Sequence, residues 1–119
     1  MNDMKPNPVK EKSFAFSIEI VKTYKQLAFG MKEYVMSKQL LRSGTAIGAL
    51  IHEAQFAQSK ADFIHKLSIS LKEANETLYW IQLLSKSGYL NENETALHKS
   101  CDELISILVS IIKTSKAKN

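Results

Sequence analysis

The sequence predicts an all-α protein folded as an antiparallel up-down-up-down four-helix bundle. Both prolines lie within the first eight of 119 residues, so the remaining chain has no helix breaker of this kind. Apolar residues make up 45% of the chain and recur at helical three- and four-residue steps. A chain of this length forms one domain around a single core. We expect a flexible N-terminal segment over residues 1–12, the bundle over 13–115 and a basic C-terminal tail over 116–119.

The first helix is expected to begin near Ser13, a residue type that favours helix N-caps, and to end at Gly30. The segment 31–36 is expected to form the turn that follows. The residues predicted to face the core share helical spacing along one side: Phe14, Ile18, Val21, Tyr24 and Ala28.

The second helix is expected over about 37–57 and contains two glycines. Each glycine costs a helix interior about 0.8–1 kcal/mol relative to alanine, so a compensating contact is needed. We therefore expect Gly44 and Gly48 to let a neighbouring helix approach closely. The predicted core stripe has a 4-3-4-3 rhythm suited to bundle packing: Leu40, Gly44, Ile47, Ile51 and Ala54.

A break is expected near Gln58–Ser59, because the apolar stripe shifts phase there and Ser59 with Asp62 resembles a capping box. The third helix is predicted over 60–87, ending before Gly88, and the fourth begins near Asn93. The third helix has the predicted stripe Ile64, Leu67, Leu71, Ala74, Leu78 and Ile81. The fourth has Leu97, Cys101, Leu104, Leu108 and Ile111, widened by Ile105 and Ile112.

Some apolar residues fit none of these stripes. A single bundle cannot easily bury all of them, and exposed apolar patches often mark subunit contacts, so we expect self-association. These residues are Phe16, Ile20, Phe29, Phe56, Ile69, Trp80 and Leu83.

Basic residues are concentrated in one early segment and at the C-terminal end, which predicts a nucleic-acid-binding surface or, alternatively, a solvated lysine face. Between residues 22 and 42, five basic residues stand against Glu33 alone. Arg42 and Glu53 share a helix face, so Arg42 has two possible roles: pairing within the bundle or gripping phosphate. The candidate nucleic-acid-binding residues are Lys22, Lys25, Lys32, Lys38, Arg42, Lys113, Lys116 and Lys118.

No motif supports an enzyme, a metal site or a cofactor. The stretch HEAQF (52–56) lacks the second histidine of a zinc-protease helix, and DFIH (62–65) supplies only one of the two motifs of a di-iron site. Cys101 lies on the apolar stripe, where a buried inert thiol is expected rather than one activated by His98. One cysteine and the lack of a long uncharged stretch predict a cytoplasmic protein without a membrane span.

The segment 39–84 resembles the bacterial four-helix-bundle proteins named for intervening sequences in 23S rRNA. Their pattern contains Q-L-x-R-S, S-I-G-A-N, E-A and Q-S-K-x-D-F-I-H-K-L-S-I, and this chain departs from it at Ala46 and Leu50. The matching positions are Gln39, Leu40, Arg42, Ser43, Ile47, Gly48, Ala49, Glu53, Ala54 and 58–67 except Ala61, and so include Ser59, Lys60 and Asp62.

The resemblance implies a four-helix bundle without known catalysis, often assembled as a homopentamer. The family is similar to the accessory protein of diversity-generating retroelements, which binds nucleic acid and a reverse transcriptase. The leading hypothesis is therefore a non-enzymatic homo-oligomer that binds RNA or single-stranded nucleic acid. The alternative is a protein-interaction scaffold with no direct nucleic-acid contact.

Overall fold

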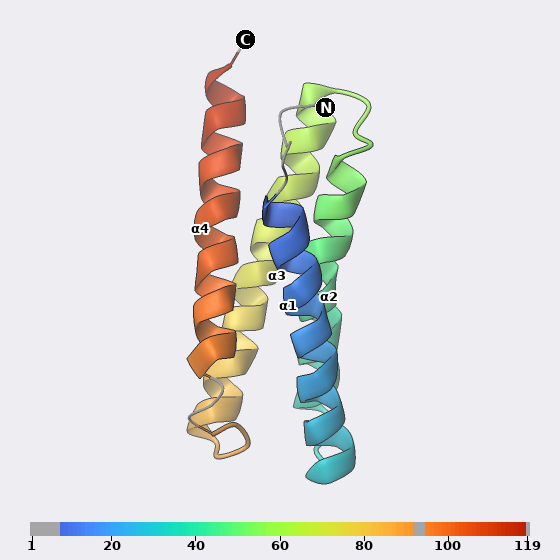
Figure 1. Cartoon of the computed structure of the whole chain (residues 1–119), viewed down its shortest axis with the longest axis vertical. Coiled ribbons are helices and arrows are strands. Elements are labelled where there is room, and N and C mark those ends of the chain that lie inside the picture. Colours follow the sequence, from blue (N-terminus) through green and yellow to red (C-terminus); the bar gives the residue numbers. More distant parts are fainter. Residues whose placement is uncertain (1–7, 92–94, 119) are drawn as a thin grey trace.

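The computed structural model describes residues 8–91 and 95–118, which form an all-α bundle (Figure 1). The elements are α1 (Pro8–Lys25), a π-helical turn η2 (Gln26–Gly30), α2 (Met36–Ala54), α3 (Lys60–Lys86) and α4 (Thr95–Ala117). Successive helices run antiparallel, and α1 also contacts α4, which closes the bundle. The molecule measures 49 × 21 × 20 Å. The predicted fold class is confirmed.

The start of α1 lies at Pro8, and the prediction of a start near Ser13 is wrong. Proline suits a first helical turn, because its missing N–H has no intrahelical partner there. Ser13 is 2% exposed, and its hydroxyl donates to the Lys10 carbonyl at 3.0 Å. The expected flexible segment therefore does not extend over residues 8–12, and residues 1–7 lie outside the described residues.

The predicted core face of α1 is also wrong. Phe14 is 69% exposed and Ile18 44% exposed, and Val21 is exposed as well. The observed core positions follow a heptad that includes two hydroxyl residues: Val9, Ser13, Phe16, Ile20, Thr23 and Leu27. Thr23 tolerates burial because its hydroxyl donates to the Glu19 carbonyl of the same helix at 2.8 Å.

The turn after α1 is wound more widely than an α-helix. The Met31 N–H donates to the Gln26 carbonyl at 3.1 Å, and the Glu33 N–H reaches back to the Leu27 carbonyl at 2.9 Å. Gly30 ends the helical run, as predicted. The left-handed backbone conformation falls instead at Lys32, with a φ of 57°. This conformation is uncommon for a residue with a side chain.

Glu33 caps the N-terminus of α2. Its carboxylate accepts the N–H groups of Val35, Met36 and Ser37 at 3.2, 3.1 and 2.7 Å. The Ser37 hydroxyl donates to the Glu33 carbonyl at 2.6 Å. Although partial desolvation opposes the shift, these hydrogen bonds hold the pKa of Glu33 below its usual value. The cap was not predicted, although an isolated acid just before a predicted helix is a signal that could have found it.

The glycines of α2 bring α1 close, as predicted. A Cβ atom on Gly44 would lie 2.8 Å from two carbon atoms of the buried Ile20 side chain. On Gly48 it would lie 3.1 Å from the Ser17 hydroxyl and 3.3 Å from the Ser13 carbonyl oxygen. The predicted core stripe of α2 is confirmed, since its apolar members are fully buried.

The ends of α3 match the prediction. Ser59 is the N-cap and accepts the Asp62 N–H at 3.0 Å, while the Asp62 carboxylate accepts the Gln58 N–H at 3.2 Å. Gly88 follows the helix with a φ of 87°, a conformation that glycine adopts without strain. The connection between α2 and α3 is therefore a true break.

The core stripes of α3 and α4 differ partly from those predicted. In α3, the predicted residues Ile64, Leu71 and Leu78 are only half-buried. The fully buried residues are Phe63, Leu67, Ser70, Ala74, Thr77, Ile81 and Leu84. In α4 the predicted stripe holds, except that Ile112 rather than Ile111 is the buried residue. Asn93, the expected start of this helix, lies outside the described residues.

Two further observations concern the described helices. α4 continues to Ala117, so the first residues of the expected tail are helical. No helix in the described ranges is both long enough and apolar enough to span a bilayer.

Candidate nucleic-acid interface

The eight basic candidates fall into two groups at opposite ends of the molecule. One group flanks the connection between α1 and α2, at the lower end in Figure 1. The other, comprising Lys113, Lys116 and Lys118, lies at the C-terminal end of α4, at the upper end. The longest dimension is 49 Å, so the structure does not bring the tail and the early basic segment together in one chain.

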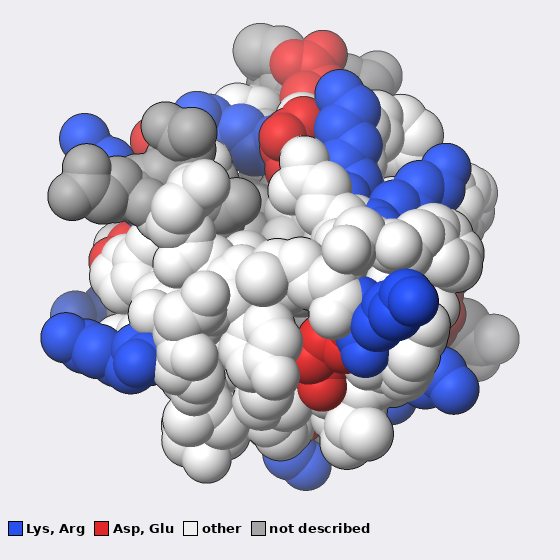
Figure 2. Space-filling model, turned by 90° about the horizontal axis from the view of Figure 1, so that it is seen from below, with Lys and Arg blue, Asp and Glu red and all other residues white. Residues whose placement is uncertain are grey.

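The end formed by residues 22–38, called the basic end below, combines exposed lysines with exposed apolar side chains. Figure 2 looks at this end of the bundle and shows an uncharged area with Lys and Arg distributed around it and several Asp and Glu among them. Its basic side chains are those of Lys22, Lys25, Lys32 and Lys38, all on exposed residues. Its exposed large apolar residues are Phe29 (70%), Met31 (48%), Tyr34 (51%) and Val35 (74%).

The charge at the basic end is weakly compensated. Lys22 lies 3.6 Å from the Glu19 carboxylate, and both side chains are largely exposed, so this ion pair contributes little. Within the described part of the chain, Lys25, Lys32 and Lys38 form no ion pair. Glu33 is the only acid between residues 22 and 42, and its capped carboxylate, which stays ionised because its pKa is lowered, offsets one of the positive charges.

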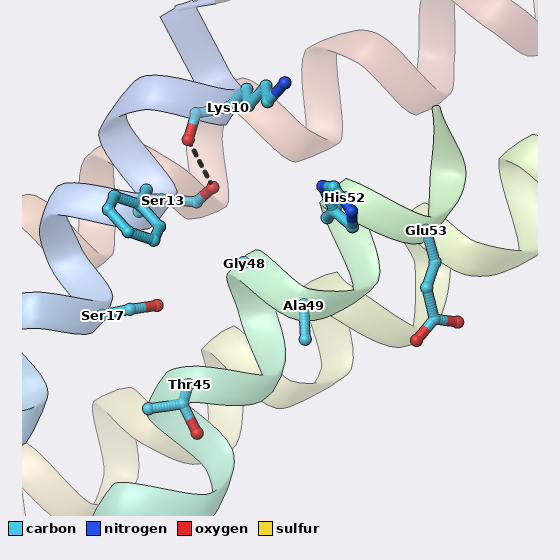
Figure 3. A pocket seen from close by; sticks show the side chains of 9 residues that line it. Lys10, Ser13, Ser17, Thr45, Gly48, Ala49, His52 and Glu53 are labelled. Carbon is cyan, nitrogen blue, oxygen red and sulfur yellow. Dashed lines mark hydrogen bonds between the residues drawn. The ribbon is translucent and has the colours of Figure 1, made fainter. Parts of the chain in front are cut away.

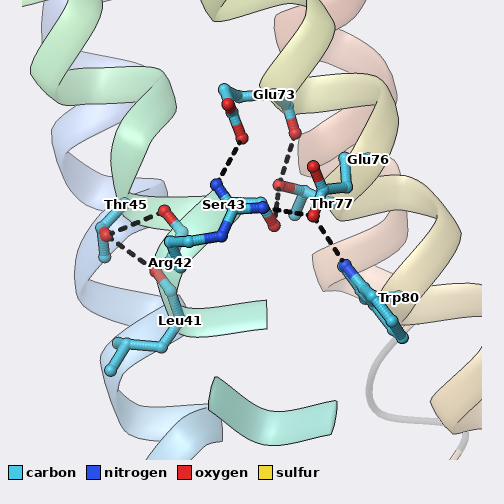
Figure 4. Close-up of polar contacts among 8 residues, drawn as sticks. All are labelled: Leu41, Arg42, Ser43, Thr45, Glu73, Glu76, Thr77 and Trp80. Carbon is cyan, nitrogen blue, oxygen red and sulfur yellow. Dashed lines mark hydrogen bonds and ion pairs between the residues drawn. The ribbon is translucent and has the colours of Figure 1, made fainter. Parts of the chain in front are cut away.

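Arg42 crosses from α2 to α3 (Figure 4). Its guanidinium donates to Glu73 at 3.2 Å and to Glu76, which also accepts the Trp80 indole N–H at 3.0 Å. The hydrogen bond to Glu76 contributes most to raising the pKa of Arg42. The Trp80 hydrogen bond, followed by that from Arg42, lowers the pKa of Glu76. These contacts favour the role within the bundle over the phosphate-gripping role.

The other motif residues of segment 39–84 occupy structural positions. Ser43 is fully buried and lies 2.9 Å from the Thr77 hydroxyl. Glu53 does not pair with Arg42 but accepts a hydrogen bond from Lys66 at 3.0 Å, an exposed contact that raises the pKa of Lys66. The remaining motif residues either pack or cap, as described for Gly48, Ser59 and Asp62, or are exposed, as are Gln39 and Lys60.

A groove of about 500 Å³ runs between α1 and α2 (Figure 3). Gly48 lies at its centre, between Ser13 and Ser17 on one side and Ala49 and His52 on the other. Its lining is completed by Lys10, Phe14, Thr45 and Glu53. This groove was not predicted, because Phe14 was expected to face the core.

The cysteine and histidine side chains form no reactive pair. Cys101 is fully buried, its thiol donates to the Ala74 carbonyl at 3.4 Å, and desolvation raises its pKa to about 12. His98 is directed instead to Asp102, at 3.2 Å. The predicted inert thiol is consistent with this geometry. Among residues 8–91 and 95–118, no three His, Cys, Asp or Glu side chains are grouped as a metal would require.

Comparison with known proteins gives a family and a fold. The sequence model of the family described as 23S rRNA-intervening sequence protein matches residues 5–110. A crystal structure from Bacteroides thetaiotaomicron, of a protein with unknown function from the S23 ribosomal protein family, is 53% identical in sequence. It aligns with a TM-score of 0.87 over 88% of this chain and 98% of that one. No curated protein matches the chain.

Proposed function

The chain belongs to the 23S rRNA-intervening sequence protein family, and from this premise we propose that it is a cytoplasmic, non-enzymatic, homo-oligomeric bundle that binds RNA or single-stranded nucleic acid. The observation that carries the proposal is the basic end. Four exposed lysines surround one connection there, and the single acid among them is occupied by a helix cap. A group of lysines with this excess of positive charge attracts phosphates.

Oligomerisation would strengthen this attraction. Each chain carries a formal net charge of +4, so an assembly of several copies presents several basic ends to one polymer. The family resemblance implies that five subunits assemble as a ring. The exposed residues Phe14, Ile18 and Val21 supply an apolar surface on which copies could associate. A monomer at micromolar concentration in sedimentation analysis would contradict the oligomeric part of the proposal.

Nucleic-acid binding is tested by titrating the protein into a fluorescent single-stranded RNA at increasing salt. Because binding releases counterions from phosphates, we expect the affinity to fall steeply between 50 and 200 mM salt, as is usual for several phosphate contacts. A Lys25→Glu, Lys38→Glu variant should lose most of the affinity. The matched variant at the opposite end, Lys113→Glu, Lys116→Glu, should keep most of it. Negligible binding by the wild-type protein at low salt would contradict the proposal.

The alternative, a protein-interaction scaffold, is favoured by one observation, the apolar groove between α1 and α2. Its walls include the exposed Phe14 and Ala49, and an amphipathic helix of a protein partner would cover them. An Ala49→Glu substitution separates the two functions, because Ala49 lines the groove but lies outside the surface formed by Phe14, Ile18 and Val21. It should abolish capture of a protein partner from nuclease-treated lysate if the scaffold is correct, and leave RNA binding per assembled subunit unchanged.

A further inference from the structure

Two aromatic residues of the basic end are held in solvent rather than in the core. Phe29 is 70% exposed and Tyr34 51% exposed, although large apolar side chains are usually buried. Phe29 is steadied by an edge-on contact with Tyr24, whose ring centroid lies 6.2 Å away with an interplanar angle of 72°. An edge-on contact leaves the face of a ring available to another flat group.

The backbone that presents these rings is fixed on both sides. The π-helical turn ends at Gly30, and the Glu33 N–H is bound to the Leu27 carbonyl. On the other side, the Glu33 carboxylate holds three N–H groups of the first turn of α2. Between them Lys32 adopts a left-handed backbone conformation, which carries an energetic cost for a lysine. Such conformations and π-turns occur disproportionately at functional sites.

From this arrangement we infer that the basic end is a site for single-stranded nucleic acid, in which unpaired bases stack on Phe29 and Tyr34 while Lys25, Lys32 and Lys38 hold the adjacent phosphates. This inference rests on the proposed function and specifies its ligand. Aromatic faces beside lysines are the combination that binds single strands, because every unpaired base has a face to stack. In a duplex the bases are already stacked on each other, so rings on a protein surface gain little from them.

The C-terminal end of α4 lacks this combination. Along the described part of α4 from residue 107 onward, Val109 is the only exposed large apolar residue, although three lysines follow it. Phe56, in the connection between α2 and α3, is as exposed as Phe29 and contacts His52 edge-on at 5.4 Å. Its neighbours in sequence are mixed in charge, with the acids Glu53 and Asp62 as well as the exposed Lys60. Phe56 is therefore a matched control for exposure without an excess of basic neighbours.

The experiment measures binding of fluorescein-labelled oligouridine of 20 nucleotides, and of an RNA duplex of 20 base pairs, by fluorescence anisotropy. We expect the Phe29→Ala, Tyr34→Ala variant to bind oligouridine at least 10-fold more weakly, since one stacked base is worth about 5- to 150-fold. Duplex binding should stay unchanged, and so should the slope of log affinity against log salt. The Phe29→Leu, Tyr34→Leu variant, which keeps apolar bulk, should show most of the same loss.

Two control variants distinguish stacking from charge. Phe56→Ala should bind oligouridine as the wild-type protein does. Lys25→Gln, Lys38→Gln should instead flatten the salt slope by about 1.4, because each phosphate contact contributes about 0.7 on single strands. Circular dichroism and sedimentation of each variant establish that fold and subunit number are unchanged.

Each contrary outcome contradicts a different part of the proposals. If the wild-type protein binds neither RNA at 50 mM salt, the proposed function and this inference both fail. If the wild-type protein binds oligouridine and both aromatic variants bind it as tightly as the wild-type protein does, only this inference fails. The inference is also overturned if those variants lose subunit association, because the rings would then form a subunit contact. It is overturned as well if they lose binding to phosphatidylserine vesicles but keep oligouridine binding, because the rings would then contact lipid.

Discussion

The two sides of α2 hold their neighbours by different means. Toward α1, the contact depends on an absent side chain, since Ile20 occupies the space beside Gly44. Toward α3, the contact depends on paired polar groups. The Ser70 hydroxyl donates to the Ile47 carbonyl at 2.9 Å, and the Thr77 hydroxyl donates to the Ser43 hydroxyl. A steric contact is sensitive to any added atom, whereas a hydrogen-bonded contact is sensitive to an unpaired donor or acceptor. The difference predicts which substitutions each side tolerates.

The largest effect is expected on the steric side. Gly44→Ala should lower the free energy of unfolding by about 1–3 kcal/mol, because the new Cβ overlaps the buried Ile20 side chain. In an Ile20→Ala background the same substitution should raise stability, since the space is empty and alanine favours the helix by about 0.8–1 kcal/mol. Urea denaturation at one fixed protein concentration measures both. An effect of the same sign in both backgrounds would contradict the steric explanation.

The polar side should show a different signature. Thr77→Val leaves the buried Ser43 hydroxyl without its partner and should cost about 1–3 kcal/mol in unfolding free energy. Adding Ser43→Ala should recover part of this loss, because neither residue then leaves a buried group unpaired. Thr23→Val is the control, since that hydroxyl bonds only within α1 and its loss should change stability little. Additive single effects would rule out coupling between the two hydroxyls.

A smaller effect is expected from the charged pairs at the edge of the polar side. Arg42→Gln should cost less than about 1 kcal/mol, because the Arg42 side chain is 51% exposed. The pKa of Glu76 is lowered from 4.5, so its contribution is present above that value and is lost as pH falls through the lower folded-state pKa. Lowering the pH from 7 to 3 should therefore reduce the free energy of unfolding more for the wild-type protein than for the Glu76→Gln variant. Equal losses would assign the acid sensitivity to other groups, such as Glu33.

The smallest effect is expected at the second glycine. Gly48→Ala places its Cβ 3.1 Å from the Ser17 hydroxyl, which can rotate, and 3.3 Å from a carbonyl oxygen of α1. The slight displacement should nearly cancel the helix gain of about 0.8–1 kcal/mol, leaving stability unchanged within about 1 kcal/mol. Thermal unfolding followed by circular dichroism checks this. A loss as large as that for Gly44→Ala would show that the steric contact extends along the whole interface.

The sequence was sufficient for the core face of α2, although this helix ends at Ala54 rather than near residue 57, but not for the orientation of α1. In α2 a single face carries nearly all the large apolar residues, so the period of the pattern identifies the core. In α1 two faces compete, and the buried one contains Ser13 and Thr23, whose hydroxyls are satisfied by their own backbone. Hydrophobic periodicity therefore favoured Phe14, Ile18 and Val21, which are exposed. The same ambiguity explains why Phe16 and Ile20 were expected outside the core.

The candidate site was predictable as a set of residues but not as a place. Clustering along the chain identified the lysines of residues 22–38, and local sequence is enough there because one helical connection carries them. The position of these lysines relative to those of the tail depends on helix direction and length, which place the two groups at opposite ends of the bundle. The pairing of Arg42 with Glu73 and Glu76 depends on how α2 and α3 are aligned, which helical spacing within α2 could not supply.

The two-sided character of α1 has a consequence for how damage to this protein would be detected. Its outer residues Phe14, Ile18 and Val21 contribute little to holding a single chain together, so replacing them should leave the melting of an isolated subunit nearly unaltered. Any penalty would surface only as a dependence on dilution, when copies or partners must meet. Assays on purified monomer would then classify such variants as harmless, and a defect would emerge only in a setting in which a copy or a partner covers the second side.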